Sequence, residues 1–218
     1  MVLGLGSGRS GSTSLTALVA TIDGSCATHE NPPLIFWRPI DDQVDFHLQR
    51  LQRLSLARSV VFDAAHWWLH ALDAFFARFP AGNVVGLVRE TDACVNSFLS
   101  IKGRGRGSIN HWAPLGNGIW PPKFWDPVYP TYPLPDAARA DPDGAKVDLI
   151  RRYVVEYNGR LAKWAERMPD RVLLVRTEDL SRSETQRQIF EFVGATGKPF
   201  DKVLNAGTHL DGQQTYWM

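Results

Sequence analysis

Near its start the 218-residue chain reads Gly4-Leu5-Gly6-Ser7-Gly8-Arg9-Ser10-Gly11-Ser12-Thr13-Ser14-Leu15, the segment most informative about its architecture. It follows a short apolar run, residues 2–5, and it precedes residues 12–22, where apolar side chains recur at the period of a helix. The pattern predicts a strand, a glycine-rich loop and a helix in direct succession. The free N–H groups and the dipole at the start of such a helix make a binding site for an anion.

The rest of the chain repeats the alternation of strands and helices. Continuous apolar runs predict buried strands of a parallel sheet, at residues 59–62, 84–88 and 171–175. Apolar side chains at helical spacing predict helices, at residues 41–58, 67–79, 91–101, 146–168 and 184–193. We therefore predict one α/β domain over residues 1–218, a three-layer P-loop-like fold with a central parallel sheet and helices on both faces.

Residues 102–145 break this pattern. Basic residues alternate with glycines at Lys102, Arg104 and Arg106, and six aromatic residues follow among prolines. Loops of this length, about forty residues, are usually functional or disordered. Because the segment is rich in aromatic side chains, we predict a lid or an acceptor-binding insertion there.

Composition narrows the class of protein. The chain has 24 Lys and Arg against 23 Asp and Glu, a net charge of +1, so it has no general field that would attract a nucleic acid. No stretch approaches the roughly 20 apolar residues of a membrane span. Cys26 and Cys94 are too few for a disulfide scaffold and lack the CxxC spacing of zinc or redox sites, which favours a cytoplasmic location. We expect a small ligand held at a local site.

Several interpretations of the glycine loop compete. The motif Gly6-x-Gly8-x-x-Gly11 matches the dinucleotide fingerprint, but that fingerprint needs an acidic residue at the end of a second strand, and the region near Glu30 reads His-Glu-Asn-Pro-Pro. The same glycines have the spacing of a P-loop, yet Ser12 stands where the phosphate-binding lysine belongs, which disfavours a standard ATP or GTP enzyme. A third interpretation is a purely structural glycine turn.

In a fourth interpretation the loop is a modified P-loop whose cation, Arg9, lies inside it. The segment Arg9-Ser10-Gly11-Ser12-Thr13 resembles the 5′-phosphosulfate loop of the sulfotransferases that use 3′-phosphoadenosine 5′-phosphosulfate (PAPS). That family has a second signature, an arginine at the end of a central strand and a serine eight positions later on the next helix. Here residues 84–88 run into Arg89, and Ser97 stands eight positions later. Such a pair can converge on one phosphate above the sheet.

The resemblance covers residues 2 to about 180 and implies a role for each matching residue. Residues 173–180 are similar to the family's strand that ends in Tyr-Glu-Asp-Leu, although Thr177 replaces the tyrosine. The residues that would bind the 5′-phosphosulfate are Gly8, Arg9, Ser10, Gly11, Ser12 and Thr13, and those that would bind the 3′-phosphate are Arg89 and Ser97.

The reaction that the resemblance implies is sulfuryl transfer. PAPS would give its sulfuryl group to a hydroxyl or amine of a small-molecule, carbohydrate or peptide acceptor, leaving adenosine 3′,5′-bisphosphate. Arg9 would neutralise charge on the leaving phosphate oxygen. The transfer has no obligatory metal ion, which agrees with the missing P-loop lysine and with the lack of an evident metal-ligand cluster in the sequence.

Two residues compete for the role of the base that removes the acceptor proton. In the tyrosylprotein and several bacterial branches of the family a glutamate follows the loop cation by about twenty residues, and Glu30 stands 21 after Arg9. In the branch that acts on phenols and steroids a histidine precedes the phosphate arginine by about 22, and His66 stands 23 before Arg89. The loop arginine and the His-Glu-Asn-Pro-Pro context favour Glu30, and His66 remains the alternative.

Two other functions stay open from the sequence. A small-molecule kinase or another P-loop nucleotide enzyme would use ATP and Mg²⁺. A nucleotide-binding protein without turnover would keep the loop but transfer nothing.

Overall fold

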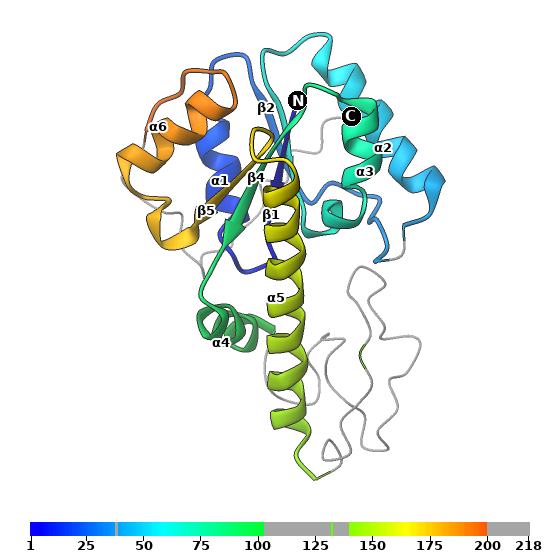
Figure 1. Cartoon of the computed structure of the whole chain (residues 1–218), viewed down its shortest axis with the longest axis vertical. Coiled ribbons are helices and arrows are strands. Elements are labelled where there is room, and N and C mark those ends of the chain that lie inside the picture. The colour runs from blue at the N-terminus through cyan, green and yellow to red at the C-terminus, as the bar shows by residue number, and fades with distance from the viewer. Residues whose placement is uncertain (38, 103–131, 133–139, 200–218) are drawn as a thin grey trace.

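The computed structural model describes residues 1–37, 39–102, 132 and 140–199, and they form a parallel sheet flanked by helices (Figure 1). The sheet has five strands in the order β2-β3-β1-β4-β5. The strands are β1 (Val2–Leu5), β2 (Cys26–His29), β3 (Val61–Ala64), β4 (Asn83–Val88) and β5 (Val172–Arg176). The helices are α1 (Ser12–Val19), α2 (Asp41–Ser55), α3 (Leu72–Arg78), α4 (Thr91–Lys102), α5 (Pro142–Arg167) and α6 (Ser183–Phe192), with 3-10 turns η1 (His66–His70) and η4 (Thr177–Asp179).

The predicted three-layer α/β architecture is confirmed. All four neighbouring strand pairs are parallel, and the sheet separates two apolar cores. Leu3 and Leu5 pack in one core with α2, α3, α4 and α5, whereas Val2 packs in the other with α1 and α6. This division follows from the period of two along a strand, which sends neighbouring side chains to opposite faces. The inner strands β1, β3 and β4 are therefore buried on both sides.

The strand β2 was not predicted from the sequence. Its four residues, Cys-Ala-Thr-His, show no apolar run, and all four are only partly buried because β2 lies at the edge of the sheet. It pairs with β3 in the register Cys26 to Val61 and His29 to Ala64. This strand brings the residues that follow it to the carboxyl edge of the sheet.

The prediction of one helix over residues 67–79 is wrong in part. The chain forms the 3-10 turn η1 and then the shorter α3, with Ala71 at the junction. Trp67 and Trp68 are both buried in η1. In this tight turn the bulky side chains of successive residues are all buried in the core. The resulting run of apolar residues resembles the apolar content of an amphipathic helix, which is why the sequence predicted a longer helix.

The predicted insertion is shorter than residues 102–145. Its first residue, Lys102, is the last residue of α4, and its last residues, 142–145, belong to α5. Asp141 caps α5: its carboxylate accepts a hydrogen bond from the N–H of Gly144 at 2.8 Å, and Pro142 occupies the first helical position. Residues 103–131 and 133–139 lie outside the described part. Tyr132, which is described, donates to the carboxylate of Glu156 on α5. Among the described helices, none combines the length and apolar character required to cross a membrane.

The central strand β1 sets a steric limit that can be tested. A Cβ on Gly4 would overlap the ring of Phe62 and lie 2.9 Å from the Cβ of Ala64. We expect Gly4→Ala to lower the free energy of unfolding in urea by about 1–3 kcal/mol, because the core is overpacked. In the control Gly159→Ala on α5 nothing lies within 4 Å of the new Cβ, and stability should rise by about 1 kcal/mol. Equal stabilities of the two variants would contradict the packing of β1.

Candidate active site

The loop of residues 6–11 links β1 to α1 at the carboxyl edge of the sheet. Gly8, Arg9 and Gly11 have φ values of 78°, 54° and 91°, in the left-handed region. Glycine enters this region without steric cost, whereas Arg9 is one of only two non-glycine residues in the described chain that adopt it. Left-handed residues beside right-handed ones can turn successive N–H groups toward one centre, an arrangement that binds anions in other proteins.

Neighbouring elements hold the loop through its carbonyl oxygens. Arg89, at the end of β4, donates from Nη1 to the carbonyl of Arg9 at 2.9 Å. Thr177, after β5, donates from its hydroxyl to the carbonyl of Ser10 at 2.6 Å. These donors fix the loop carbonyls on the protein side, so an approaching anion meets N–H groups. Thr177 thus has a clear contact here, although the family pattern has tyrosine at this position.

The structure brings together three residues predicted to bind the nucleotide. Arg9 donates from Nε to the hydroxyl of Ser97 on α4 at 3.3 Å, while Arg89 bonds to the backbone of Arg9. Two cationic side chains and a hydroxyl from distant parts of the chain therefore lie around one point beside the loop. The buried thiol of Cys94 lies beneath them, 3.9 Å from the carbonyl of Arg9, and burial raises its pKa, so it stays protonated.

The hydroxyls of the loop differ in their surroundings. Ser10 is buried, and its Oγ has no hydrogen-bond partner among the described residues. This Oγ lies so close to Gly6 that a Cβ at that position would overlap it. A buried hydroxyl of this kind calls for a partner, and a phosphate oxygen in the loop would be one. Ser12 lies 2.8 Å from Nε2 of His29, and Thr13 is exposed. No pattern in the sequence singles out His29, because its contact with Ser12 depends on the unpredicted strand β2.

The two candidate bases lie next to each other. Glu30 follows β2 and His66 begins η1, and Oε1 of Glu30 is 3.5 Å from Nδ1 of His66. The Glu30 side chain is 45% exposed, whereas the His66 side chain is 4% exposed. The N–H of Glu30 also bonds to the carbonyl of Ala64 at 2.8 Å, which continues the pairing of the two strands. Their spacings along the chain predict that one or the other is the base, whereas the fold brings both together as a carboxylate–imidazole pair.

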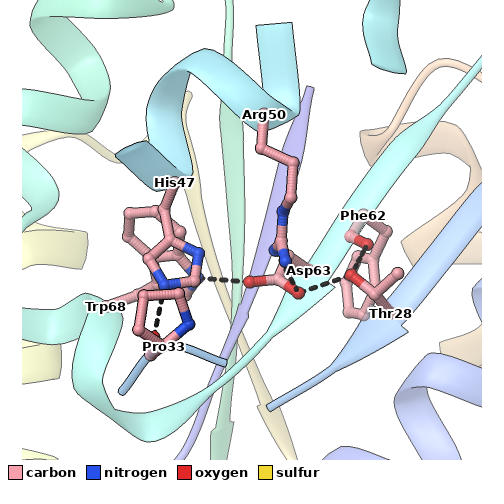
Figure 2. Close-up of polar contacts among 7 residues, drawn as sticks. All are labelled: Thr28, Pro33, His47, Arg50, Phe62, Asp63 and Trp68. Carbon is pink, nitrogen blue, oxygen red and sulfur yellow. Dashed lines mark hydrogen bonds and ion pairs between the residues drawn. The ribbon is translucent and has the colours of Figure 1, made fainter. Parts of the chain in front are cut away.

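A buried polar cluster, here called the Asp63 cluster, joins β3 to β2, η1 and α2 (Figure 2). Asp63 on β3 is fully buried and accepts from Nε1 of Trp68 at 2.7 Å and from the hydroxyl of Thr28. Nη2 of Arg50, on α2, lies 3.7 Å from the same carboxylate. A buried carboxylate is costly unless such donors surround it.

The Asp63 cluster connects the two segments that carry the candidate bases. Thr28 stands two residues before Glu30, and Trp68 stands two residues after His66. Beside the cluster, the ring of His47 bonds through Nε2 to the carbonyl of Pro33, and burial lowers the pKa of this histidine. The segment after Glu30 is thereby fixed to α2 as well.

Comparisons with known proteins agree on one fold. Three solved structures align with 96% of this chain: the sulfotransferase domain of the Synechococcus PCC 7002 olefin synthase (17% identity, 77% of that chain, TM-score 0.59), the sulfotransferase domain from the curacin biosynthetic pathway (15%, 78%, 0.55) and a sulfotransferase from Alicyclobacillus acidocaldarius (14%, 85%, 0.56). The chain has a sulfotransferase-like fold. No protein-family profile matches the sequence, and a search of curated proteins finds no significant match.

The described residues contain no group of three or more His, Cys, Asp and Glu side chains that could hold a metal ion. The polar groups gathered at the site are the loop backbone and the side chains of Arg9, Arg89 and Ser97. These groups fit phosphate and sulfate oxygens.

His70 gives the site region a pH-dependent contribution to stability. Its ring packs edge-on against Trp37 at 3.9 Å between centroids, and burial, with smaller effects of His66 and Arg160, lowers its pKa to about 3. In the unfolded chain histidine binds its proton near pH 6.5, so the folded state loses stability as the pH falls from about 6.5 toward 3.

We expect His70→Phe to remove this part of the pH dependence. The phenyl ring keeps an aromatic contact with Trp37 but cannot take up a proton. Urea unfolding at pH 7 and pH 5 should show that the wild type loses up to about 2 kcal/mol more than the variant over this interval. The same loss in both proteins would mean that His70 is protonated in the folded state.

Proposed function

We propose that this protein is a sulfotransferase that moves a sulfuryl group from PAPS to a hydroxyl or amine of an acceptor and releases adenosine 3′,5′-bisphosphate. The observation that carries the proposal is the cluster of Arg9, Arg89 and Ser97 beside a glycine loop, on a sulfotransferase-like fold. A carboxylate–imidazole pair at the neighbouring strand ends supports it.

The nucleotide would be held at two positions. The 5′-phosphosulfate would lie against Gly8, Gly11 and the hydroxyl-bearing residues Ser10, Ser12 and Thr13, where the helix dipole of α1 also favours a negative charge. Arg89 and Ser97 would hold the 3′-phosphate by charge-assisted and neutral hydrogen bonds. Arg9 lies between the two positions, because its backbone belongs to the loop and its guanidinium contacts Ser97. On nucleotide binding we expect this guanidinium to meet the phosphosulfate.

The chemistry would be an in-line displacement at sulfur. The acceptor oxygen or nitrogen forms a bond to sulfur while the bond from sulfur to the 5′-phosphate oxygen breaks, and Arg9 stabilises the charge that grows on that oxygen. The acceptor proton goes to Glu30, which is the more exposed member of the pair. His66 then orients this carboxylate from its buried side. None of these steps requires a metal ion.

The acceptor would be a small molecule, a carbohydrate or a peptide. We propose that the aromatic insertion within residues 102–145 serves as a lid or contributes to acceptor binding. The chain would form one domain, since β5, near the end of the described part, pairs directly with β4 from the first half.

The 3′-phosphate contact predicts a preference between nucleotides. Adenosine 3′,5′-bisphosphate should bind about tenfold or more tightly than AMP, because only it can use Arg89 and Ser97, and a lost charge-assisted bond costs roughly 1.5–3 kcal/mol. Arg89→Ala should abolish this preference, whereas Arg187→Ala, on the exposed surface of α6, should leave it intact. Calorimetric titration with both nucleotides measures the ratio. Equal affinity of the wild type for the two nucleotides would remove the central support for the proposal.

The assignment of the base predicts a hierarchy of rates. Glu30→Gln keeps the size of the side chain but removes its basicity, so the single-turnover rate should fall by about 10²–10⁴. His66→Gln should cost less, about tenfold, and the double variant should be no slower than Glu30→Gln, because both residues act in one unit. Glu166→Gln on the exposed face of α5 serves as the control. A nearly unchanged Glu30→Gln beside a strongly impaired His66→Gln would make His66 the base.

A further inference from the structure

Tyr157 on α5 bridges the loop and the segment that carries His66. Its hydroxyl lies 3.3 Å from the N–H of Gly6, the first residue of the loop, and 2.9 Å from the carbonyl of His66, the first residue of η1. The side chain is fully buried. One oxygen atom thus contacts the backbone of the nucleotide loop and the backbone of a candidate base.

The direction of both hydrogen bonds follows from the groups involved. The His66 carbonyl can only accept, so the hydroxyl proton points to it, and the hydroxyl oxygen accepts from the N–H of Gly6. Burial raises the pKa of Tyr157 far above its usual range, which favours the protonated hydroxyl that this geometry requires. The bridge therefore has one orientation.

The Tyr157 bridge lies just beyond the last paired residues of β1 and β3, where strand pairing no longer connects the loop to η1. Strands β1 and β3 pair up to Gly4 and Ala64, and the N–H of Ala65 still bonds to the carbonyl of Gly4 at 3.1 Å. Beyond this point the chain after β1 enters the loop, and the chain after β3 enters η1. The Tyr157 hydroxyl satisfies the next donor on one side and an acceptor on the other, so it extends the connection past the end of the ladder.

We propose that Tyr157 is a positioning residue that sets the distance between the nucleotide loop and the Glu30–His66 pair, and that it transmits nucleotide binding at the loop to η1. The inference rests on the proposed function for its consequence in catalysis. Sulfuryl transfer needs the donor sulfur and the base on opposite sides of the attacking atom, and a misplacement of about 1 Å can cost about 100-fold in rate. Nucleotide binding, in contrast, depends on many groups around the loop.

The test compares Tyr157→Phe with Tyr153→Phe. Both tyrosines are fully buried on α5, one turn apart, and both substitutions remove one hydroxyl, but the Tyr153 hydroxyl takes no part in the bridge. We expect Tyr157→Phe to lower kcat by about tenfold to 100-fold and to leave the Kd for adenosine 3′,5′-bisphosphate within about twofold. Tyr153→Phe should change neither. A loss of affinity equal to the loss of rate, or similar losses in both variants, would assign Tyr157 a merely structural role.

Hydrogen exchange tests the link without any turnover. In the nucleotide-free protein Tyr157→Phe should speed exchange both in residues 6–11 and in residues 66–70, and Tyr153→Phe should not. Adenosine 3′,5′-bisphosphate should slow exchange in both segments of the wild type but only in residues 6–11 of Tyr157→Phe.

These outcomes separate the two proposals. If the nucleotide protects residues 66–70 equally in wild type and Tyr157→Phe, or protects only the loop in the wild type, the transmission through Tyr157 is wrong. If the nucleotide protects neither segment of the wild type, the proposed function fails, and exchange in the nucleotide-free variants still decides whether the hydroxyl joins the two segments. Should Tyr157→Phe not fold, the wild type decides: protection of residues 66–70 by the nucleotide supports the transmission, and protection of the loop alone overturns it.

Discussion

The arrangement of the site depends on the donors that hold the carbonyl oxygens of the loop after β1. Arg89 and Thr177 come from the ends of β4 and β5, and they bond to the carbonyls of Arg9 and Ser10. A parallel sheet brings all its carboxyl ends to one edge, so these donors reach the loop without any further element. Once the carbonyls are fixed on the protein side, the N–H groups and the start of α1 face the opposite side, which gives the loop its preference for anions.

The strand order separates the site into two halves. The chain leaves β1 toward β3 and β2 on one side and later fills β4 and β5 on the other, so β1 is a topological switch point. The half on the β4 side carries Arg89 and Ser97, the cation and hydroxyl that would bind the 3′-phosphate in the proposed function. The half on the β2 side carries Glu30 and His66, the pair that would take a proton. A donor on one side and a base on the other is the geometry that in-line transfer needs.

The sequence was sufficient to predict that Arg9, Arg89 and Ser97 come together beside the loop, but it was insufficient to predict the contacts on the β2 side. Local patterns in the sequence predict the loop, the strand before it and the interval from Arg89 to Ser97. Such patterns can be recognised without knowing how the strands are ordered in the sheet. The contacts of His29 with Ser12 and of Glu30 with His66 depend on β2, whose polar, half-buried sequence carries no strand signal. Glu30 and His66 were predicted as alternatives from their spacings, but they follow the neighbouring strands β2 and β3 and lie next to each other. Their intervals along the chain do not reveal this proximity.

Buried and half-buried polar groups then join the half on the β2 side to the loop and to α1. The Asp63 cluster ties β2 to η1, Tyr157 ties η1 to the loop, and the contact of Ser12 with His29 ties α1 back to β2. These contacts form a closed circuit around the carboxyl edge, so each segment is held from two directions. A purely apolar core would be cheaper to form at these positions, but apolar contacts are not directional. Hydrogen bonds fix orientation as well as distance, and a site that must align a donor, an acceptor and a base depends on both.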